Sequence, residues 1–295
     1  MNPGDPPPTI LASKLMDGRP LARRIRAAAQ ANVVRIRALT GTAPTLATVL
    51  VGNDPASAAY VRMKSKRCEE VGIRSLRFDL PLGTTTEQLV ARVQQLAGDS
   101  GVHAILVQHP VPQPIDKRAA FEAIPLAKDV DGVTSGTLGR IILGLPGFIP
   151  CTPEGIMRLL SEYRVELRGA DAVVLGRSPI LGRPMASMLI NAHATVTLCH
   201  SHTRDLPSLI RRADVLIAAI GQPRFVQGDW VKPGAVVIDA GYNEGNVGDV
   251  DFEAAVRRAS LITPVPGGVG PMTIAVLIEH TVHAAAQQLP INLSD

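Results

Sequence analysis

Aromatic residues are scarce in this sequence, since phenylalanine, tryptophan and tyrosine together supply 3% of its 295 residues. Hydrophobic residues nevertheless account for 46% of the chain and charged residues for 19%, which is typical of a folded globular protein and excludes a largely disordered one. The core must therefore consist mainly of alanine, valine, leucine and isoleucine, which favours parallel strands covered by helices on both faces. The length is sufficient for two domains.

Cysteine is also rare. Cys68, Cys151 and Cys199 are widely spaced, odd in number and free of any C-x-x-C pairing. This pattern excludes a disulfide framework and a structural zinc site of the usual spacing, and we expect reduced thiols in a cytoplasmic protein. No other metal-ligand spacing and no nucleophile triad is found, so we expect no metal.

Long apolar runs are missing as well. None approaches the roughly 18 residues that a membrane span requires, so we expect no membrane partner. Residues 1–12 contain several prolines and lack the apolar core of a secretory signal, and we expect them to form a disordered tail.

The formal net charge is +4, which favours anionic ligands but does not by itself indicate nucleic acid. A nucleic-acid surface would be expected to show a dense stripe of lysine and arginine interleaved with aromatic residues, and the sequence has none. We therefore expect no nucleic-acid partner.

Strands and helices alternate along the chain. The expected strands are residues 45–51, 73–80, 102–108, 171–175, 194–198, 215–219 and 235–240, with helices or turns between them. This alternation is typical of βαβ units and parallel sheets, whose ligands bind beyond the carboxyl ends of the strands. Gln108, at the end of the third expected strand, is therefore a candidate site residue.

Helices are expected over residues 15–38, 55–72, 86–96 and 272–288, and another through residue 191. A passage rich in glycine and proline runs from Asp129 to Pro153 and predicts little regular structure. We place a domain boundary near its end, where Thr152 is expected to cap the next helix.

The stretch from Ser57 to Lys66 lies on an expected helix. Positions three and four apart share a helix face, so Ser57, Tyr60 and Lys64 would project together. This face is either a group with chemical function or a solvated basic surface.

Gly176 directly follows an expected buried strand, and Gly182 and a helix come after it. The pattern is typical of the phosphate-binding turn of dinucleotide folds, although a purely structural turn is the alternative. NAD-binding chains place a carboxylate at the end of the next strand, whereas this chain has Cys199-His-Ser-His-Thr203 there. Together with Arg177 this favours NADP, with NAD left possible. We interpret His200 and His202 as part of an exposed turn and not as metal ligands.

Two further stretches could bind a ligand. Residues 264–271 contain three glycines and three prolines, so either a flat ligand approaches a rigid backbone there or the loop is only a connector. Asp129 and Asp131 offer carboxylates that either accept hydrogen bonds from a ligand or form a turn.

A set of motifs then indicates a family. They are Tyr60-x-x-x-Lys64, Val107-Gln108-x-Pro110-x-Pro112, Lys128-Asp-Val-Asp-Gly132, Pro150-Cys-Thr-Pro153, Gly176-Arg-Ser178, Asp239-x-Gly241-x-Asn243 and Thr263-Pro-Val-Pro-Gly-Gly-Val-Gly-Pro-Met-Thr273. In this order the sequence resembles the methylenetetrahydrofolate dehydrogenase/cyclohydrolase family over nearly its whole length from about residue 15.

The resemblance implies an α/β fold of two domains with a cleft between them. Residues 13–148 and 274–295 would form a folate-binding catalytic domain with a parallel sheet, and residues 149–273 a Rossmann-type NADP-binding domain. It also implies a cytoplasmic homodimer that serves one-carbon metabolism and purine biosynthesis.

The activities implied are oxidation of 5,10-methylenetetrahydrofolate by NADP and hydrolysis of the resulting methenyl cation to 10-formyltetrahydrofolate. Two alternatives remain: a monofunctional dehydrogenase or cyclohydrolase of the same family, and a non-catalytic protein that binds folate or nucleotide.

The resemblance also implies roles for single residues. Lys64 would transfer protons, Gln108 would hydrogen-bond and tune it, Tyr60 would stack on the aminobenzoyl ring, and Asp131 would accept hydrogen bonds from the pterin. We expect Lys64 to be exposed in a cleft. Other substrate-binding residues would be Val107, His109, Pro266, Gly267, Gly268, Val269 and Gly270; the cofactor-binding residues would be Gly176, Arg177, Ser178, Ser201 and Tyr242.

Two positions depart from the family's usual residues. His109 stands where a leucine is more common, and Tyr242 replaces an aliphatic residue. His109 could tune Lys64, alter substrate fit or only pack, and these alternatives remain open. For Tyr242 we expect a packing difference alone.

Overall fold

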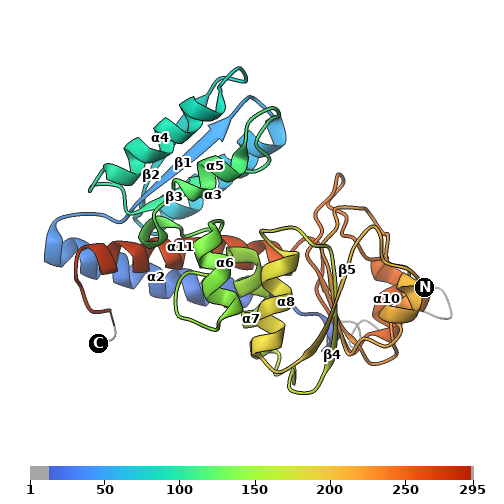
Figure 1. Ribbon diagram of the computed structural model, residues 1–295. Helices are drawn as coiled ribbons and strands as arrows, with labels where there is room; N and C mark the ends of the chain where they lie inside the picture. Colours follow the sequence, from blue (N-terminus) through green and yellow to red (C-terminus); the bar gives the residue numbers. More distant parts are fainter. Residues whose placement is uncertain (1–12, 294–295) are drawn as a thin grey trace. The chain divides into compact units, whose positions relative to one another are not determined.

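The computed structural model describes residues 13–293, which divide into two units (Figure 1). The first contains residues 23–151 and 274–293, and we call it the three-stranded unit. The second contains residues 13–22 and 152–273, and we call it the five-stranded unit. Both sheets are parallel and both units combine strands with helices, so the expected α/β class is confirmed.

In the three-stranded unit the strand order is β2-β1-β3. The strands are β1 (Thr45–Val51), β2 (Arg74–Leu80) and β3 (Ala104–Val107). All of β1 and β3 is buried, whereas β2 alternates between exposed and half-buried positions. The buried strands are mainly apolar, with Thr45 and Thr48 as the polar residues of β1, as expected of parallel strands covered on both faces.

Helices surround this sheet, and their starts follow from the sequence. In α3 (Pro55–Glu70), Asp54 accepts a hydrogen bond from the Ser57 backbone and Pro55 occupies the first turn. Thr85 and Gln88 form a capping box at the start of α4 (Thr86–Gly98). The remaining helical segments are α2 (Gly18–Thr40), α5 (Lys117–Glu122), η1 (Leu126–Lys128), α6 (Ser135–Ile142) and α11 (Val269–Gln288).

The core of the three-stranded unit lies between its strands and two long helices. Val33 and Ile36 of α2 share a buried cluster with Val276 and Val282 of α11, and these two helices run side by side in Figure 1. Because α11 is apolar on nearly all sides, it is an interior helix.

In the five-stranded unit the order is β5-β4-β6-β7-β8. Its strands are β4 (Asp171–Leu175), β5 (Thr195–Cys199), β6 (Val215–Ala218), β7 (Val236–Asp239) and β8 (Leu261–Ile262). Its remaining helical segments are α7 (Cys151–Glu162), α8 (Gly182–Asn191), α9 (Leu206–Ile210), η2 (Gly228–Trp230) and α10 (Phe252–Arg258). The chain crosses from β5 past β4 to reach β6, so the topological switch point of this doubly wound sheet lies between β4 and β6.

The division into units differs from the expected domains at the amino-terminal end. Residues 13–22 were predicted to join the folate-binding domain, but they group with the five-stranded unit. The reason is an edge pairing: Leu15 lies beside Ile262, and the backbone nitrogen of Met16 donates to the Ile262 carbonyl at 2.8 Å. The other boundary falls between Cys151 and Thr152, a few residues after the predicted one. The predicted tail, residues 1–12, lies outside the described residues.

Several local expectations were wrong. The passage expected to have little regular structure contains α6, whose start is capped by Thr134. α7 begins at Cys151, so Thr152 lies within its first turn instead of capping it. The loop expected over residues 264–271 ends inside α11, which starts at Val269, and the two-residue strand β8 before it was not predicted. Short helices and strands of two residues have too little periodicity to be recognised.

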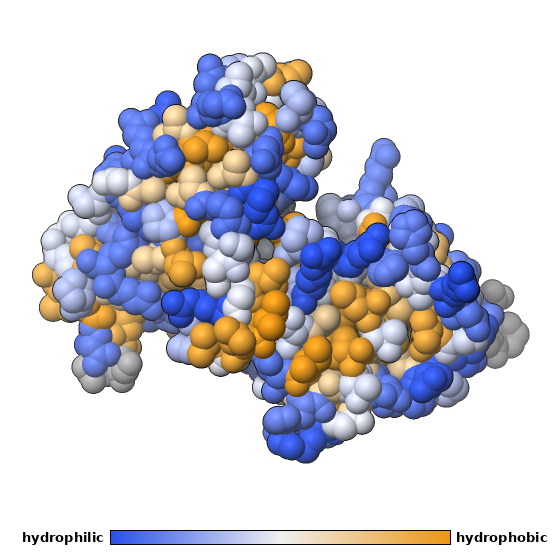
Figure 2. Space-filling model, viewed as in Figure 1, coloured by the Kyte–Doolittle hydropathy of each residue, from blue (hydrophilic) through white to orange (hydrophobic). Residues whose placement is uncertain are grey.

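On the molecular surface, apolar side chains are exposed after the end of α6, at Leu143 and Leu145, and on α8 at Ile190. Figure 2 shows apolar surface over both helices on the face that it draws. All three cysteines are buried, and none of them forms a disulfide bond within residues 13–293. Within residues 13–293 no helix is both long and apolar enough to cross a membrane.

Candidate active site

Lys64 lies on the inner face of α3, and its amine is held by two neighbours. Its Nζ atom donates a hydrogen bond to Oε1 of Gln108 at 3.1 Å and lies 4.5 Å from the centre of the Tyr60 ring. The helical spacing predicted that Tyr60 and Lys64 project together, and the structure confirms it. The predicted exposure of Lys64 is wrong, because only 6% of the residue is accessible.

Burial controls the electrostatics of this amine. Loss of solvent lowers the pKa of Lys64, while the nearby acidic groups of Asp131 and Cys151 act in the opposite direction. Burial also raises the pKa of the Tyr60 hydroxyl, so Tyr60 stays neutral. A lowered pKa increases the share of neutral amine at a given pH, and a neutral amine can accept a proton and later return it.

Gln108 follows β3, and its orientation is fixed from both sides. Its backbone nitrogen donates to the Val49 carbonyl of β1 at 2.9 Å. Its side-chain Nε2 donates to the carbonyl oxygen of His109 at 2.6 Å. The amide oxygen is therefore the end that points to Lys64, and the carboxyl end of the sheet positions this contact as the alternating pattern predicted.

His109 is the next residue and is half-buried. Its ring packs edge-on against Phe121, with ring centres 4.8 Å apart. Its Nε2 atom is buried and has no hydrogen-bond partner within residues 13–293. Burial lowers the pKa of His109, and both Asp131 and Lys64 lie within electrostatic reach of it. The imidazole is thus mainly neutral at pH 7 and keeps an unused polar atom.

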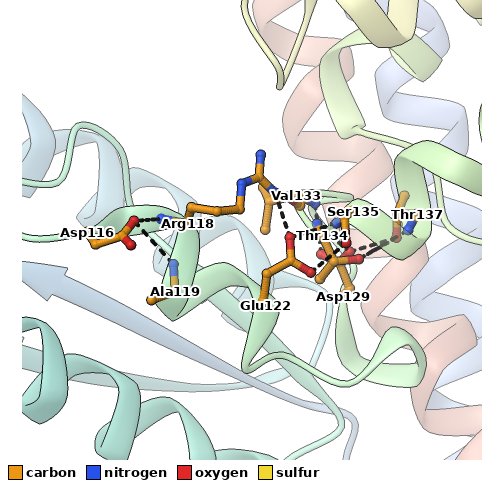
Figure 3. A network of polar contacts seen from close by, with 9 residues as sticks. All are labelled: Asp116, Arg118, Ala119, Glu122, Asp129, Val133, Thr134, Ser135 and Thr137. Atoms are coloured by element: carbon orange, nitrogen blue, oxygen red, sulfur yellow. Dashed lines mark hydrogen bonds and ion pairs between the residues drawn. The ribbon is translucent and has the colours of Figure 1, made fainter.

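Asp129 and Asp131 have different roles. Asp129 is fully buried, and its carboxylate accepts hydrogen bonds from the backbone of Val133 and Thr134 and from the Thr137 hydroxyl (Figure 3). It is therefore a structural residue that fixes the start of α6. Asp131, the carboxylate that the resemblance assigns to the pterin, is half-buried.

A second layer of polar contacts holds the same segment in place. Glu122 of α5 accepts hydrogen bonds from the backbone and hydroxyl of Ser135 and forms an ion pair with Arg118. Arg118 in turn donates to the Val133 carbonyl at 3.0 Å (Figure 3). Because both ends of the turn are fixed in this way, Asp131 is presented by a rigid backbone.

Two residues of this region were not predicted as site residues. The carbonyl oxygen of Val130, directly before Asp131, lies 3.2 Å from the Cys151 thiol and 2.9 Å from Nδ1 of His280. Cys151 belongs to a motif quoted for the family, but no pattern in the sequence indicated His280, since it lies on an otherwise apolar helix. Both residues hold the backbone that carries Asp131.

In the five-stranded unit, the turn after β4 is shaped by glycine. Gly176 has a φ of +117°, and a Cβ atom there would overlap the carbonyl oxygen of Ala219, which follows β6. A Cβ atom on Gly182 would overlap the Gly176 carbonyl in the same way. Only glycine fits these positions, and the turn lies at the topological switch point, where dinucleotides bind in such sheets.

The other predicted cofactor residues surround this carboxyl edge. The Ser178 hydroxyl accepts hydrogen bonds from the backbone of Leu181 and Gly182 at the start of α8. Arg177 and Ser201 are exposed at the ends of β4 and β5, which are register neighbours through Leu175 and Cys199. His200 lies close enough to Arg177 for their charges to interact, so the region is basic. No group of three or more metal-binding side chains occurs in the described part of the chain.

Tyr242 follows β7 and is 70% exposed, with its hydroxyl bonded to the Asn246 side chain. It therefore lies outside the buried core of this unit, and the expectation that the substitution has no functional consequence stays a prediction. Pro266 and Gly270 are exposed, whereas Gly267, Gly268 and Val269 are buried.

The predicted site residues divide between the two units. The three-stranded unit contains Tyr60, Lys64, Gln108, His109 and Asp131, with Val107 on β3. The predicted cofactor residues and Pro266–Gly270 lie in the five-stranded unit.

Comparison with known proteins identifies two domains of one family in this chain. Residues 16–131 match the model of the tetrahydrofolate dehydrogenase/cyclohydrolase catalytic domain, and residues 150–289 match the model of the NAD(P)-binding domain of the same family. "Bifunctional protein FolD 1" of Streptomyces avermitilis is 60% identical over 95% of this chain and 97% of its own length.

Solved structures agree as well. The crystal structure of the bifunctional enzyme FolD from Campylobacter jejuni has a TM-score of 0.90 and 46% identity, covering 92% of this chain and 98% of that one. The dehydrogenase-cyclohydrolase of Trypanosoma brucei, solved with NADP cofactor and inhibitor, has a TM-score of 0.90 and 37% identity, covering 93% and 98%. The predicted family is confirmed: the chain belongs to the tetrahydrofolate dehydrogenase/cyclohydrolase family.

Proposed function

We propose that this chain oxidises 5,10-methylenetetrahydrofolate to 5,10-methenyltetrahydrofolate with NADP and hydrolyses the product to 10-formyltetrahydrofolate. The observation that carries the proposal is the buried amine of Lys64, bonded to Gln108 and placed over the Tyr60 ring. Membership of a family defined by both a catalytic and an NAD(P)-binding domain supports both activities.

In the hydrolytic step, a water molecule attacks the methenyl carbon and forms a carbon–oxygen bond. Lys64 accepts a proton from this water and returns it to the ring nitrogen as the carbon–nitrogen bond breaks, while the remaining hydroxyl proton leaves as the formyl carbonyl forms. The lowered pKa of Lys64 suits both transfers. Gln108 keeps the amine in one position throughout, because its oxygen accepts a hydrogen bond from either protonation state.

Folate is recognised by residues of the same unit. Tyr60 stacks its ring on the aminobenzoyl group, and Asp131 accepts hydrogen bonds from the amino edge of the pterin. His109 is adjacent to Gln108 in the chain, and we count it among the substrate-binding residues. The further substrate contacts come from Val107 and from Pro266, Gly267, Gly268, Val269 and Gly270.

The residues at the carboxyl edge of the five-stranded sheet fit NADP. Gly176 and Gly182 keep the backbone free of side chains where the pyrophosphate lies, and the start of α8 provides a favourable helix dipole. Arg177 and Ser201 bind the extra phosphate, Ser178 shapes the turn, and Tyr242 lies beside the nicotinamide. Bound NADP supplies the acceptor for the hydride that leaves the methylene carbon. NAD remains the alternative cofactor.

We further propose a cytoplasmic homodimer whose product supplies formyl groups for purine biosynthesis. The alternative within the family is an enzyme that has kept only one of the two steps because of His109. A non-catalytic binding protein is disfavoured by the presence of Lys64, Gln108 and Asp131.

The two steps can be measured separately on one preparation. NADPH formation from 5,10-methylenetetrahydrofolate and NADP reports the dehydrogenase, and loss of methenyltetrahydrofolate without cofactor reports the hydrolase. We expect both rates to exceed the uncatalysed ones clearly. One rate without the other would establish the monofunctional alternative, and absence of both would contradict the proposal.

A further inference from the structure

Two fully enclosed carboxylates, Asp239 and Asp249, lie at the carboxyl edge of the five-stranded sheet. They are 4% and 0% exposed, and neither forms an ion pair within residues 13–293. Burying a carboxylate without a cation is costly unless hydrogen bonds satisfy its oxygens. Both are satisfied mainly by backbone nitrogens, and these nitrogens belong to the loops that follow β6 and β7.

Asp249 connects those two loops. Its Oδ2 accepts hydrogen bonds from the backbone of Ile220 at 2.7 Å and Gly221 at 3.0 Å, just after β6. Its Oδ1 accepts from the backbone of Gln222 at 2.9 Å and from the Asn243 side chain at 3.1 Å, after β7. One carboxylate thus fixes three successive peptide units of one loop and an anchor residue of the other.

Asp239, the last residue of β7, fixes Asp249 in turn. Its Oδ1 accepts hydrogen bonds from the backbone of Gly241 and Asp249, and its Oδ2 accepts from Val250, each at 2.9 Å. Cβ atoms on Gly241 and Gly248 would overlap Asp249 and Asp239 respectively, so each carboxylate fills the space left by a glycine. The two aspartates and the two glycines therefore pack directly against one another.

The loop that Asp249 holds forms the wall of the predicted phosphate turn. Ala219 precedes the three fixed peptides, and its carbonyl approaches Gly176 so closely that no side chain fits between them. The Ile220 side chain also reaches the space above Gly176. On the other side, Asn243 is next to Tyr242, the residue proposed to lie beside the nicotinamide.

We infer that Asp249 is a positioning residue for NADP: through backbone hydrogen bonds it sets the distance between the Gly176 turn and the Tyr242 loop. It touches no cofactor atom in this role. The inference rests on the proposed binding of NADP at this edge, and it assigns the geometry of that site to a residue outside it.

The test measures the dissociation constant of NADP for the wild type and for Asp249→Asn by calorimetry, together with both rates. An asparagine side chain has an NH2 group in place of one of the two oxygens, and this group cannot accept a hydrogen bond. The variant therefore releases either Ile220 and Gly221 or Gln222 and Asn243. We expect NADP to bind at least tenfold more weakly, and the ratio of dehydrogenase to cyclohydrolase activity to fall at least tenfold. Amide hydrogen exchange at residues 220–222 should become faster.

Asp214→Asn is the matched control. Asp214 belongs to the same unit but lies at the opposite, amino end of the sheet, where it accepts hydrogen bonds from the Asp171 backbone and Lys232. We expect this variant to bind NADP within twofold of the wild type. A folded Asp249→Asn variant that also binds NADP within twofold of the wild type would overturn the inference.

If Asp249→Asn does not fold, Asn243→Ala tests the inference instead. This variant removes one of the four hydrogen bonds that the Asp249 carboxylate accepts, and Asn243 is only half-buried, so its loss disturbs the core less. We expect threefold or greater weakening of NADP binding, and unchanged binding would contradict the inference. Failure of the wild type to bind NADP would instead contradict the proposed function.

Discussion

The Nζ atom of Lys64 lies 3.1 Å from Oε1 of Gln108, and both residues are buried. Gln108 donates its own side-chain hydrogen bond to the His109 carbonyl, so its amide oxygen cannot turn away from the lysine without losing that contact. The amine therefore keeps its position whether or not it carries a proton. A group that must accept a proton and then return it requires this constancy.

A buried amine should reduce stability. Since burial lowers the pKa of Lys64, the unfolded chain binds more protons than the folded chain between the folded-state pKa and about pH 10.4, the ordinary lysine value. The free energy of unfolding should therefore rise with pH in this window. We expect Lys64→Met to be more stable than the wild type at pH 7 by about 1–2 kcal/mol. We expect this difference in the free energy of unfolding to shrink as the pH approaches about 10.4.

Urea unfolding at several pH values checks this, with Lys66→Met as the control. Lys66 is exposed on the same helix, so its loss should change stability by less than about 0.5 kcal/mol at any pH. A Lys64→Met protein that is less stable than the wild type would show that the amine is a net stabilising group.

His109 should affect the rate of methenyl hydrolysis mainly at acidic pH. Burial lowers the pKa of its imidazole, so it is mainly neutral at pH 7 and gains charge on acidification. A charged His109 beside Lys64 disfavours the charged lysine and so preserves the neutral amine. Removing it should make hydrolysis fall more steeply at pH values below the lowered pKa of His109, which lies under the ordinary histidine value of about 6.5.

The measurement is the pH profile of kcat/KM for methenyl hydrolysis in the wild type, His109→Leu and His109→Gln. Glutamine keeps a polar group but does not titrate, so both variants should share the steeper acid limb. If glutamine alone restores the wild-type profile, the Nε2 atom acts by hydrogen bonding and not by charge.

Arg177 should determine the choice of cofactor. It is exposed next to the Gly176 turn in a basic region, and a charged hydrogen bond to a phosphate contributes about 1.5–3 kcal/mol. Arg177→Ala should raise the KM for NADP about 10- to 100-fold. The KM for NAD should change less than about threefold, because NAD lacks the extra phosphate.

Arg168→Ala supplies the matched control. It removes the same charge from an exposed position just before β4, at the opposite end of that strand from Arg177. Both cofactors should keep their wild-type KM values in this variant. Equal losses for NADP and NAD in Arg177→Ala would mean that the arginine binds a group that the two cofactors share.

Much of the fold followed from simple patterns. Mainly apolar runs marked β1, β4 and β6, because parallel strands are buried on both faces. The placement of residues 13–22 was missed, since a single pairing of Leu15 with Ile262 leaves no periodic signal. α6 was missed because its sequence is short and contains two glycines, and its start depends on contacts with Asp129 and Glu122.

For the site, local spacing predicted that Tyr60 and Lys64 share a face, and the end of an expected strand indicated Gln108. The family motifs then supplied the roles of Gln108 and Asp131. The burial of Lys64 could not be predicted, because a lysine on an expected helix is usually exposed. The contacts of Val130 with Cys151 and His280 join positions up to 150 residues apart. Only the folded chain brings such positions together.

The most direct test of the central claim is methenyltetrahydrofolate hydrolysis by Lys64→Met, compared with the wild type and Lys66→Met. Because Lys64 carries the proton in both halves of the step, the variant should lose at least about 100-fold in rate. NADP binding and the fold should remain unchanged. Hydrolysis at the wild-type rate by a folded Lys64→Met protein would contradict the proposed role of this amine.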